Sequence, residues 1–163
     1  YQNFPRTGSS GAEMEYRFKQ KWGFLTLTYA FYTTAWEKER IELYSVPGRR
    51  DVLLAFPAHQ LGLNGNVHVW SGWQLNLSGS LLSSRYGYTA PDQVERFAPT
   101  ALVNAFLRKQ DLWTKGLEIG IGTYDLLNQK FAFIQPYNGG HAPLPGPSRE
   151  FVARVSYAIH SWR

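Results

Sequence analysis

The sequence predicts an all-β protein built from about seven long antiparallel strands. Apolar and polar residues alternate with period two over seven segments, which together hold about half of the 163 residues. Ordinary globular proteins carry only ~20–25% strand, in pieces of ~5–6 residues, so the strand content and length are both unusual. Short turns and long loops also alternate between the segments, which is typical of a series of hairpins.

The first expected strand, residues 11–22, shows the pattern most clearly. Its even positions include Met14, Tyr16 and Phe18, whereas its odd positions carry only Glu, Lys and Arg from residue 13 to residue 21. In a later strand Phe106 is an exception, because it falls on the polar side. The remaining strands are expected at 23–34, 59–70, 73–84, 100–110, 116–126 and 149–160.

The connections predict a sheet with one plain end and one elaborated end. Three of them are short turns, at residues 21–23, 71–72 and 111–116. The other three are long loops, at residues 35–58, 85–99 and 127–148. Most of the nine prolines fall in these long loops, where a missing N–H removes no hydrogen bond from a ladder.

Composition excludes several classes of protein. The chain has no Cys, which rules out disulfide scaffolds, thiolate zinc sites and cysteine nucleophiles. With 44% hydrophobic and 16% aromatic residues it is not a disordered chain. The net charge of +5 is compatible with an acidic partner.

Together these features favour an antiparallel transmembrane β-barrel segment. A strand that crosses a bilayer needs ~9–11 residues when tilted by ~45°, and its backbone must be hydrogen-bonded within the sheet. Outer-membrane barrels combine such strands with short periplasmic turns and longer outer loops. Aromatic residues gather near the strand ends, as they do at membrane interfaces: Trp22, Trp70, Trp73, Tyr86, Tyr88, Trp113 and Trp162.

Two other folds also fit the alternation. A soluble, lipocalin-like ligand-binding barrel has alternating strands, although soluble strands usually run only ~3–10 residues. A self-contained small outer-membrane barrel, acting in adhesion or as an enzyme, would need about eight strands. Its eighth strand would come from the loop 35–58, where Ile41, Leu43 and residues 52–56 have some strand character.

The last third of the chain carries motifs of a known family. Residues 124–128 read Tyr-Asp-Leu-Leu-Asn, residues 145–149 read Pro-Gly-Pro-Ser-Arg, and a final strand covers 151–162. This succession resembles the C-terminal end of TonB-dependent outer-membrane receptors, in which an Asn-Leu-Phe-Asp-like tail, a Pro-Gly-Pro-type loop and a last strand follow one another. The segments 56–59 and 84–87 also resemble barrel hairpins of that family.

The resemblance implies that residues 1–163 are the C-terminal part of a larger barrel, which has 22 strands in the family. The plug and the N-terminal strands are expected outside this chain. The implied partners are those remaining strands and the plug, a TonB-type energy-coupling complex that acts through the plug, and lipid or lipopolysaccharide, with no nucleic acid. The implied protein lies in the bacterial outer membrane. It binds a scarce solute, siderophore-like or another nutrient, at the extracellular face and imports it to the periplasm.

Two sets of residues are candidates for binding. The polar faces of the strands are expected to line the lumen, through Glu13, Glu15, Arg17, Lys19, Asn64, Asn66, His68, Asn104, Arg108, Glu118 and Arg154. The charges on the first strand are expected to form ion pairs across neighbouring strands or to contact a plug. The loop candidates for ligand binding are Arg49, Arg50, Tyr88, Phe97, Phe131, Phe133, Tyr137 and His141.

Nothing in the sequence indicates catalysis. The four His residues lie far apart, which does not favour a metal site. No Gly-x-Ser-x-Gly elbow of a hydrolase is found. We therefore expect no enzyme activity, no metal and no cofactor.

Overall fold

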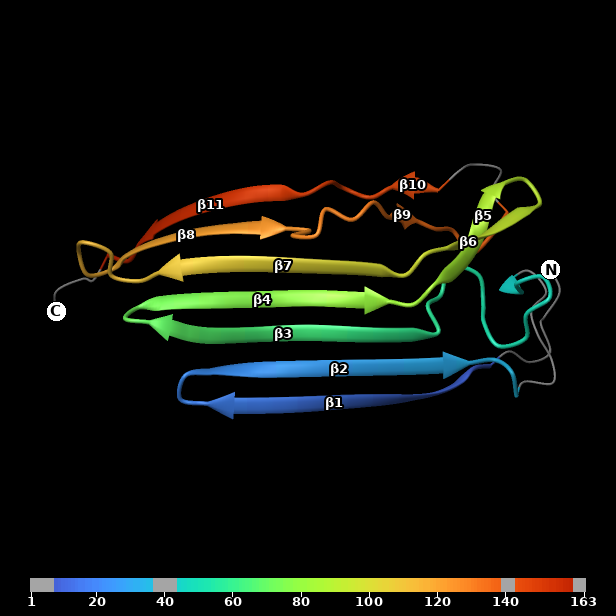
Figure 1. Cartoon of the computed structure of the whole chain (residues 1–163), viewed down its shortest axis with the longest axis horizontal. Coiled ribbons are helices and arrows are strands. Elements are labelled where there is room, and N and C mark those ends of the chain that lie inside the picture. Colours follow the sequence, from blue (N-terminus) through green and yellow to red (C-terminus); the bar gives the residue numbers. More distant parts are fainter. Residues whose placement is uncertain (1–7, 37–43, 139–142, 160–163) are drawn as a thin grey trace.

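A computed structural model describes residues 8–36, 44–138 and 143–159. Its main feature is one seven-stranded antiparallel sheet, in which the strands follow one another in chain order (Figure 1). The strands are β1 (Ser10–Gln20), β2 (Gly23–Thr33), β3 (His59–Trp70), β4 (Trp73–Leu82), β7 (Thr100–Lys109), β8 (Leu117–Tyr124) and β11 (Glu150–Tyr157). No helix in the described part of the chain is long and apolar enough to cross a membrane.

All seven strands predicted from the sequence are present, with small differences at their ends. β8 is shorter than the expected 116–126, because it lies between Gly116 and Asp125, whose φ angles of 90° and 48° are left-handed. β11 ends at Tyr157, whereas the prediction extended to residue 160, which lies outside the described residues.

The connections alternate as the sequence predicts. Figure 1 shows the tight turns at one end of the sheet, which we call the turn end, and the long connections at the other, which we call the loop end. The loop 85–99, expected without strands, contains a separate hairpin of β5 (Arg85–Ala90) and β6 (Gln93–Phe97). In the last connection, β9 (Ala132–Phe133) pairs with β10 (Leu144–Pro145). No eighth long strand forms in the described part of 35–58, which has only an isolated bridge between Ser45 and Leu53, and Ile41 and Leu43 lie outside the described residues.

The strand register joins the apolar residues into one continuous face. Tyr29 of β2 pairs with Leu61 of β3, which pairs with Leu81 of β4. At the other side of the sheet Leu107 of β7 pairs with Ile121 of β8. Because paired residues point to the same side of a sheet, the apolar positions lie on one face throughout. We call this the apolar face, and the opposite side the polar face.

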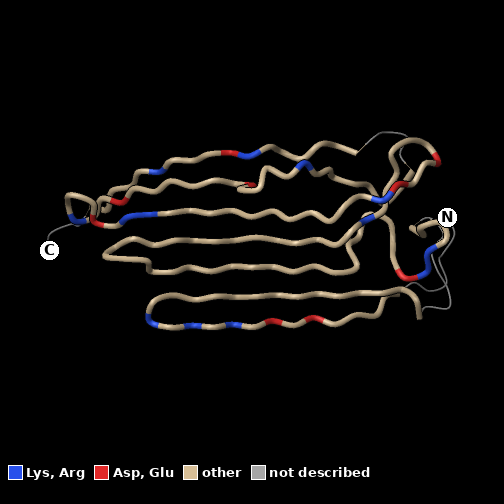
Figure 2. The backbone as a smooth tube through the Cα atoms, in the orientation of Figure 1, with Lys and Arg blue, Asp and Glu red and all other residues tan. Residues whose placement is uncertain are grey.

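The polar face is continuous as well. Asn64 of β3 pairs with Ser78 of β4, which pairs with Asn104 of β7. Figure 2 shows that Lys, Arg, Asp and Glu are confined to β1, to β7, β8 and β11, and to the two ends of the sheet. β2, β3 and β4 contain none of these residues. The centre of the polar face is therefore neutral and rich in hydrogen-bonding groups.

Phe106 lies on this polar face for a local reason. Its ring covers two glycines of β8: a Cβ added at Gly120 would lie 2.6 Å from the Cε1 atom of the ring. At Gly122 the added Cβ would lie 2.2 Å from Cδ2 of the same ring. The exception in the sequence pattern thus arises because one aromatic side chain fills the space that two glycines leave.

In the described residues, no apolar core packs against either face of the main sheet. The buried apolar residues are Val46, Val52 and Leu54, which belong to the first long connection and pack with Tyr86 and Tyr88 of β5. The apolar face itself is uncovered, and large side chains such as Ile121, Phe151 and Val155 are 63%, 79% and 73% exposed. The described part of the chain therefore lacks the self-sufficient core that a lipocalin-like barrel requires.

The sheet is also open. In the described part of the chain β1 pairs only with β2, and β11 pairs only with β8. The two edge strands do not meet, so the described residues do not close into the small barrel considered as an alternative.

Candidate binding site

The long connections contact one another at the loop end of the sheet. The N–H of Ala55 donates to the carbonyl of Tyr86 at 2.7 Å. On the other side of the β5–β6 hairpin, Asn138 Nδ2 donates to Asp92 Oδ1 at 2.7 Å. These hydrogen bonds join the hairpin to the connection before it and to the connection after it. The loop end is therefore one packed unit that rests on the sheet.

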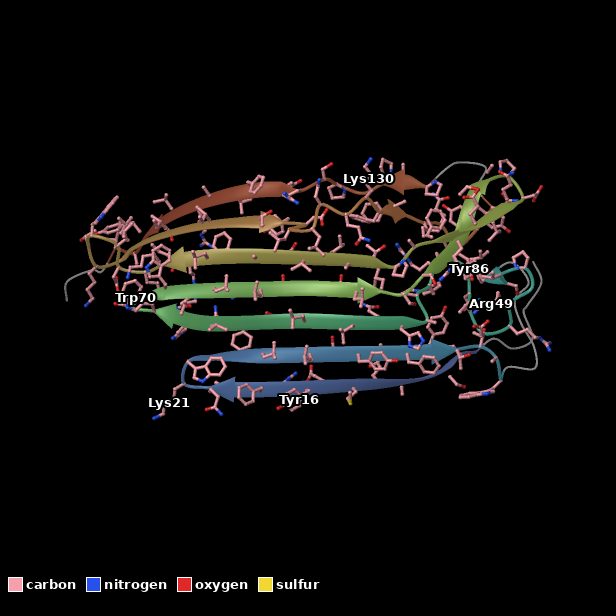
Figure 3. All side chains as sticks on the ribbon, in the orientation of Figure 1. Tyr16, Lys21, Arg49, Trp70, Tyr86 and Lys130 are labelled. Atoms are coloured by element: carbon pink, nitrogen blue, oxygen red, sulfur yellow. The ribbon has the colours of Figure 1, made fainter. Side chains whose placement is uncertain are left out.

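Arg49, a loop candidate for ligand binding, is held within this unit (Figure 3). Its Nε donates to Asp51 Oδ1 at 2.8 Å, and its Nη1 donates to the hydroxyl of Tyr86 at 3.1 Å. The guanidinium carbon also lies 5.6 Å from the centroid of the Tyr86 ring. The hydrogen bonds with the Asp51 carboxylate raise the pKa of Arg49 above its ordinary value. An incoming anion must compete with Asp51 for this side chain.

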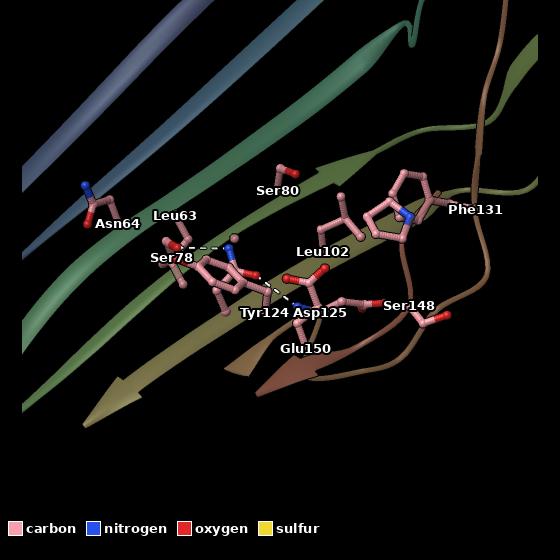
Figure 4. A pocket seen from close by; sticks show the side chains of 13 residues that line it. Leu63, Asn64, Ser78, Ser80, Leu102, Tyr124, Asp125, Phe131, Ser148 and Glu150 are labelled. Atoms are coloured by element: carbon pink, nitrogen blue, oxygen red, sulfur yellow. Dashed lines mark hydrogen bonds between the residues drawn. The ribbon is translucent and has the colours of Figure 1, made fainter. Parts of the chain in front are cut away.

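A cavity of about 680 Å³ lies on the polar face, next to the loop end (Figure 4). Its floor combines the neutral polar side chains Asn64, Ser78 and Asn104, from three adjacent strands, with the apolar Leu63 and Leu102. The connection between β8 and β11 supplies Asp125 and Phe131. The cavity therefore lies between the sheet and a connection that folds back over it.

A chain of hydrogen bonds positions that connection (Figure 4). Asn104 Nδ2 donates to Ser78 Oγ at 3.3 Å, and Asn104 Oδ1 accepts from the N–H of Asp125 at 3.0 Å. The N–H of Gln129 then donates to Asp125 Oδ1 at 3.2 Å, and Gln129 Nε2 donates to the carbonyl of Pro99 at 3.1 Å. Asp tolerates the left-handed backbone at residue 125, so the sequence allows the chain to turn back here.

The Pro-Gly-Pro stretch provides the surface on which Phe131 packs. A Cβ added at Gly146 would lie 2.3 Å from Cζ of the Phe131 ring. The N–H of Gly146 also donates to the carbonyl of Phe131 at 2.9 Å. The ring also contacts Phe133, with centroids 5.5 Å apart. Glycine at residue 146 is thus required for the close approach of this ring.

The turn end of the polar face carries a separate charged network. Arg108 Nε donates to Gln74 Oε1 at 3.1 Å, and Arg108 Nη1 lies 3.7 Å from Glu118 Oε2. Gln110 Nε2 donates to the same Glu118 oxygen at 3.4 Å. Two predicted lumen residues, Arg108 and Glu118, therefore neutralise each other at one end of the face.

The expected contacts of the β1 charges, with a neighbouring strand or with a plug, remain a prediction, because β2 supplies no charged partner for Glu15 and Arg17. Arg17 pairs with Glu15 of its own strand at 2.6 Å. The residues of β2 opposite these two are Thr26 and Thr28, which carry no charge. Since the other edge of β1 has no neighbour in the described residues, only a partner outside them is left for cross-strand pairing.

The structure brings three predicted site residues together and separates the others. Asn64, Asn104 and Phe131 line the same cavity. Arg154 lines a smaller adjoining hollow of about 410 Å³. Tyr88 packs against the buried cluster of Val46, Val52 and Leu54, which we call the loop core. The positions of the remaining candidates are as follows: Asn66 is buried and His68 exposed in β3, Phe97 is half-buried in β6, Phe133 and Tyr137 are exposed, Arg50 accepts a hydrogen bond from Thr34 through its carbonyl, and His141 lies outside the described residues.

Sequence reasoning missed some residues of the cavity. Ser78 and Glu150 line it, and both have the polar parity of their strands, so the alternation contained the signal. Asp125 belongs to the motif 124–128, but only the folded-back connection shows that it lines a cavity. Among the described residues, no group of three or more His, Asp or Glu is arranged to hold a metal ion.

Comparisons with known proteins identify the fold. No family model matches the chain, and no curated protein matches it. Among solved structures, the ferric-catecholate import receptor Fiu of Escherichia coli K12 matches with a TM-score of 0.75 and 14% identity. The match covers 91% of this chain and 20% of Fiu. The chain has the fold of a receptor barrel wall.

A second structure agrees. A mutant of the ferric enterobactin receptor PfeA of Pseudomonas aeruginosa matches with a TM-score of 0.63 and 13% identity, over 91% of this chain and 22% of PfeA. The chain thus spans about a fifth of the length of either receptor. The predicted fold, a segment of an antiparallel transmembrane barrel, is confirmed. The barrel wall also accounts for the uncovered apolar face and the open edges described above.

Proposed function

We propose that this barrel wall is the C-terminal portion of a TonB-dependent receptor of the bacterial outer membrane. The receptor binds a scarce solute, siderophore-like or another nutrient, at its extracellular face and imports it to the periplasm. The observation that carries the proposal is the single-layer sheet with one uncovered apolar face, which matches two ferric siderophore receptors over 91% of its length.

The apolar face supports a location in lipid. Exposed apolar patches larger than a few hundred Å² are rare on soluble monomers. Here large exposed apolar residues lie on this face of β1, β3, β4, β8 and β11, from Met14 on β1 to Val155 on β11. In a bilayer the same residues contact hydrocarbon. Near the turn end, Trp70 and Trp113 are 76% and 91% exposed, which suits the interface between lipid and water.

The open edges support partners that complete the barrel. An unpaired strand edge in hydrocarbon leaves backbone groups without hydrogen bonds, so membrane sheets close into barrels. β1 and β11 therefore pair with further strands of the same protein or of another chain. In this proposal a plug fills the interior, a TonB-type complex acts through the plug, and basic loop residues such as Lys130 contact lipopolysaccharide.

The proposed activity is selective binding and gated passage, without catalysis. The solute first meets the loop end, where Arg49, Arg50, Tyr88, Phe97, Phe131, Phe133, Tyr137 and His141 are the candidates for contact. Phe131 is the loop candidate that lines the cavity of about 680 Å³ on the polar face. The lumen residues then line the route to the turn end.

An uptake experiment tests the proposal. Cells that lack the gene are compared, under iron limitation, with cells that carry it on a plasmid, and uptake of radioactive iron from ferric catecholate and ferric hydroxamate chelates is measured. We expect uptake of at least one chelate to depend on the gene and on a functional TonB system. Recovery of the protein in the soluble fraction, or uptake of none of a broad panel of nutrients, would contradict the proposal.

A further inference from the structure

The cavity on the polar face has an unusual charge for a receptor of ferric chelates, many of which are anionic. The described residues that line it include two carboxylates, Asp125 and Glu150, and no Lys or Arg. The rest of the floor is neutral. Arg108, on the same face, is paired with Glu118 toward the turn end. An anion in this cavity would meet two carboxylates, whereas the nearby Arg149 and Arg154 are not among the residues that line it.

Asp125 is the more informative of the two carboxylates. It is only 6% exposed, and its Oδ1 accepts a hydrogen bond from Gln129. Its Oδ2 is buried and has no hydrogen-bond partner. Arg149 reaches the same residue, but its Nε donates to the main-chain carbonyl at 3.4 Å. A buried carboxylate oxygen without a donor is uncommon in proteins, which points to a donor that the ligand supplies.

We propose that this cavity binds the ammonium or guanidinium group of the transported solute, with Asp125 as its counter-ion. The proposal rests on the proposed function, because it names the charge of the solute that the same receptor takes. Phe131 and Tyr124 border the cavity and pack against the apolar part of such a solute. The volume of about 680 Å³ lies within the ~300–1,000 Å³ that is usual for small-molecule sites.

The hydroxyl and amide groups of the floor fit the same solute. Ser78, Ser80 and Asn104 offer both donors and acceptors, which a neutral hydroxyl-rich or hydroxamate-type chelate satisfies. The site therefore favours a chelate that is neutral around the metal and carries one cationic group. It selects against a highly anionic catecholate complex.

The test uses the complete receptor that contains this chain, purified in detergent. Two ferric trihydroxamate chelates serve as probes: one has a free primary amine, and the other has that amine acetylated. Isothermal titration calorimetry gives both affinities for the unaltered receptor, for Asp125→Asn and for the control Glu95→Gln. The control removes a carboxylate from the exposed hairpin strand β6, outside the cavity.

We expect the amine chelate to bind about 10- to 100-fold more tightly than the acetylated chelate, the usual effect of a hydrogen bond to a charged group. Asp125→Asn should remove that difference by weakening only the amine chelate, whereas Glu95→Gln should preserve it. Asn has nearly the shape of Asp and retains an oxygen for the Gln129 hydrogen bond, so the fold is kept.

Two results would overturn the inference and leave the proposed function intact. One is equal binding of the two chelates, or binding of neither by a receptor that imports another ferric chelate. The other is an Asp125→Asn variant with a lowered melting temperature and an unchanged ratio of affinities, which would mean that a basic side chain of the protein fills the cavity. If the receptor imports no nutrient at all, the proposed function itself fails.

Discussion

Arginine substitutions on β4 (Trp73–Leu82) test which face of the sheet contacts hydrocarbon. Leu77 lies at the middle of this strand, on the apolar face. Asn76, its neighbour in the chain, is exposed on the polar face. Leu81 shares the apolar face with Leu77 but lies near the loop end. The three positions therefore separate the effect of the face from the effect of depth in the membrane.

The expected magnitudes follow from the position of each residue along the strand. At a rise of ~3.3 Å per residue and a tilt of ~45°, Leu77 lies about 10 Å below either end of β4, close to the bilayer midplane. Arginine on the lipid face costs ~2–4 kcal/mol at the midplane and ~0–1 kcal/mol near the interface. We expect Leu77→Arg to fall in the first range, Leu81→Arg in the second, and Asn76→Arg within about 0.5 kcal/mol of the unaltered protein.

The free energy of unfolding is measured on the complete receptor refolded into lipid vesicles. Urea titrations followed by tryptophan fluorescence give the values, and the mobility of unheated samples in gel electrophoresis reports the folded barrel independently. Equal costs for Leu77→Arg and Asn76→Arg would refute the assignment of the two faces. A larger cost at Leu81 than at Leu77 would refute the membrane geometry, because a packed protein core has no reason to follow bilayer depth.

Three further substitutions probe the polar face and the loops. Gly122→Ala places a Cβ 2.2 Å from the Phe106 ring and should destabilise the barrel by ~1–3 kcal/mol, and a double-mutant cycle with Phe106→Ala should show that the second change relieves part of this cost; simple additivity would contradict the contact. Glu118→Gln should cost only ~0.2–1 kcal/mol, less at high salt, because Arg108 is 35% exposed in this ion pair; a larger, salt-independent cost in urea titrations would show that the pair is desolvated. Asp92→Ala removes the side-chain link between the β5–β6 hairpin and the last connection and should speed proteolysis within the loops; unchanged cleavage would show that packing alone holds the hairpin.

Most of the sheet could be predicted from the sequence, because a half-buried strand imposes period two on its residues. The long strands are the clearest cases, since a strand such as β1 shows the alternation over many successive residues. The β5–β6 hairpin was missed because its strands are short and join no neighbour of the main sheet. The apolar residues of the hairpin pack in the loop core instead, where Tyr86 and Tyr88 contact the cluster that contains Leu54.

The candidate site was harder to predict, because it depends on how one connection folds back over the sheet. The polar parity of Asn64 and Asn104 placed both residues on the correct face in advance. Nothing local to Asp125 shows that it lines a cavity, since that depends on hydrogen bonds to Asn104 and Gln129. The partners of Arg49 include Tyr86, which is distant in the sequence, and this contact too is set by tertiary structure.

The apolar face and the open edges together restrict how this chain can exist. If only the apolar face were uncovered, detergent or lipid could solvate the sheet as it stands. The edges of β1 and β11, however, present backbone N–H and C=O groups that hydrocarbon cannot satisfy, and each such group costs several kcal/mol there. A bilayer therefore stabilises the faces of the sheet but not its edges, so strands that pair with both edges are required for insertion. The cavity and its Asp125 then face an interior that those strands help to enclose, where lower solvent exposure strengthens the attraction between a carboxylate and a cationic solute.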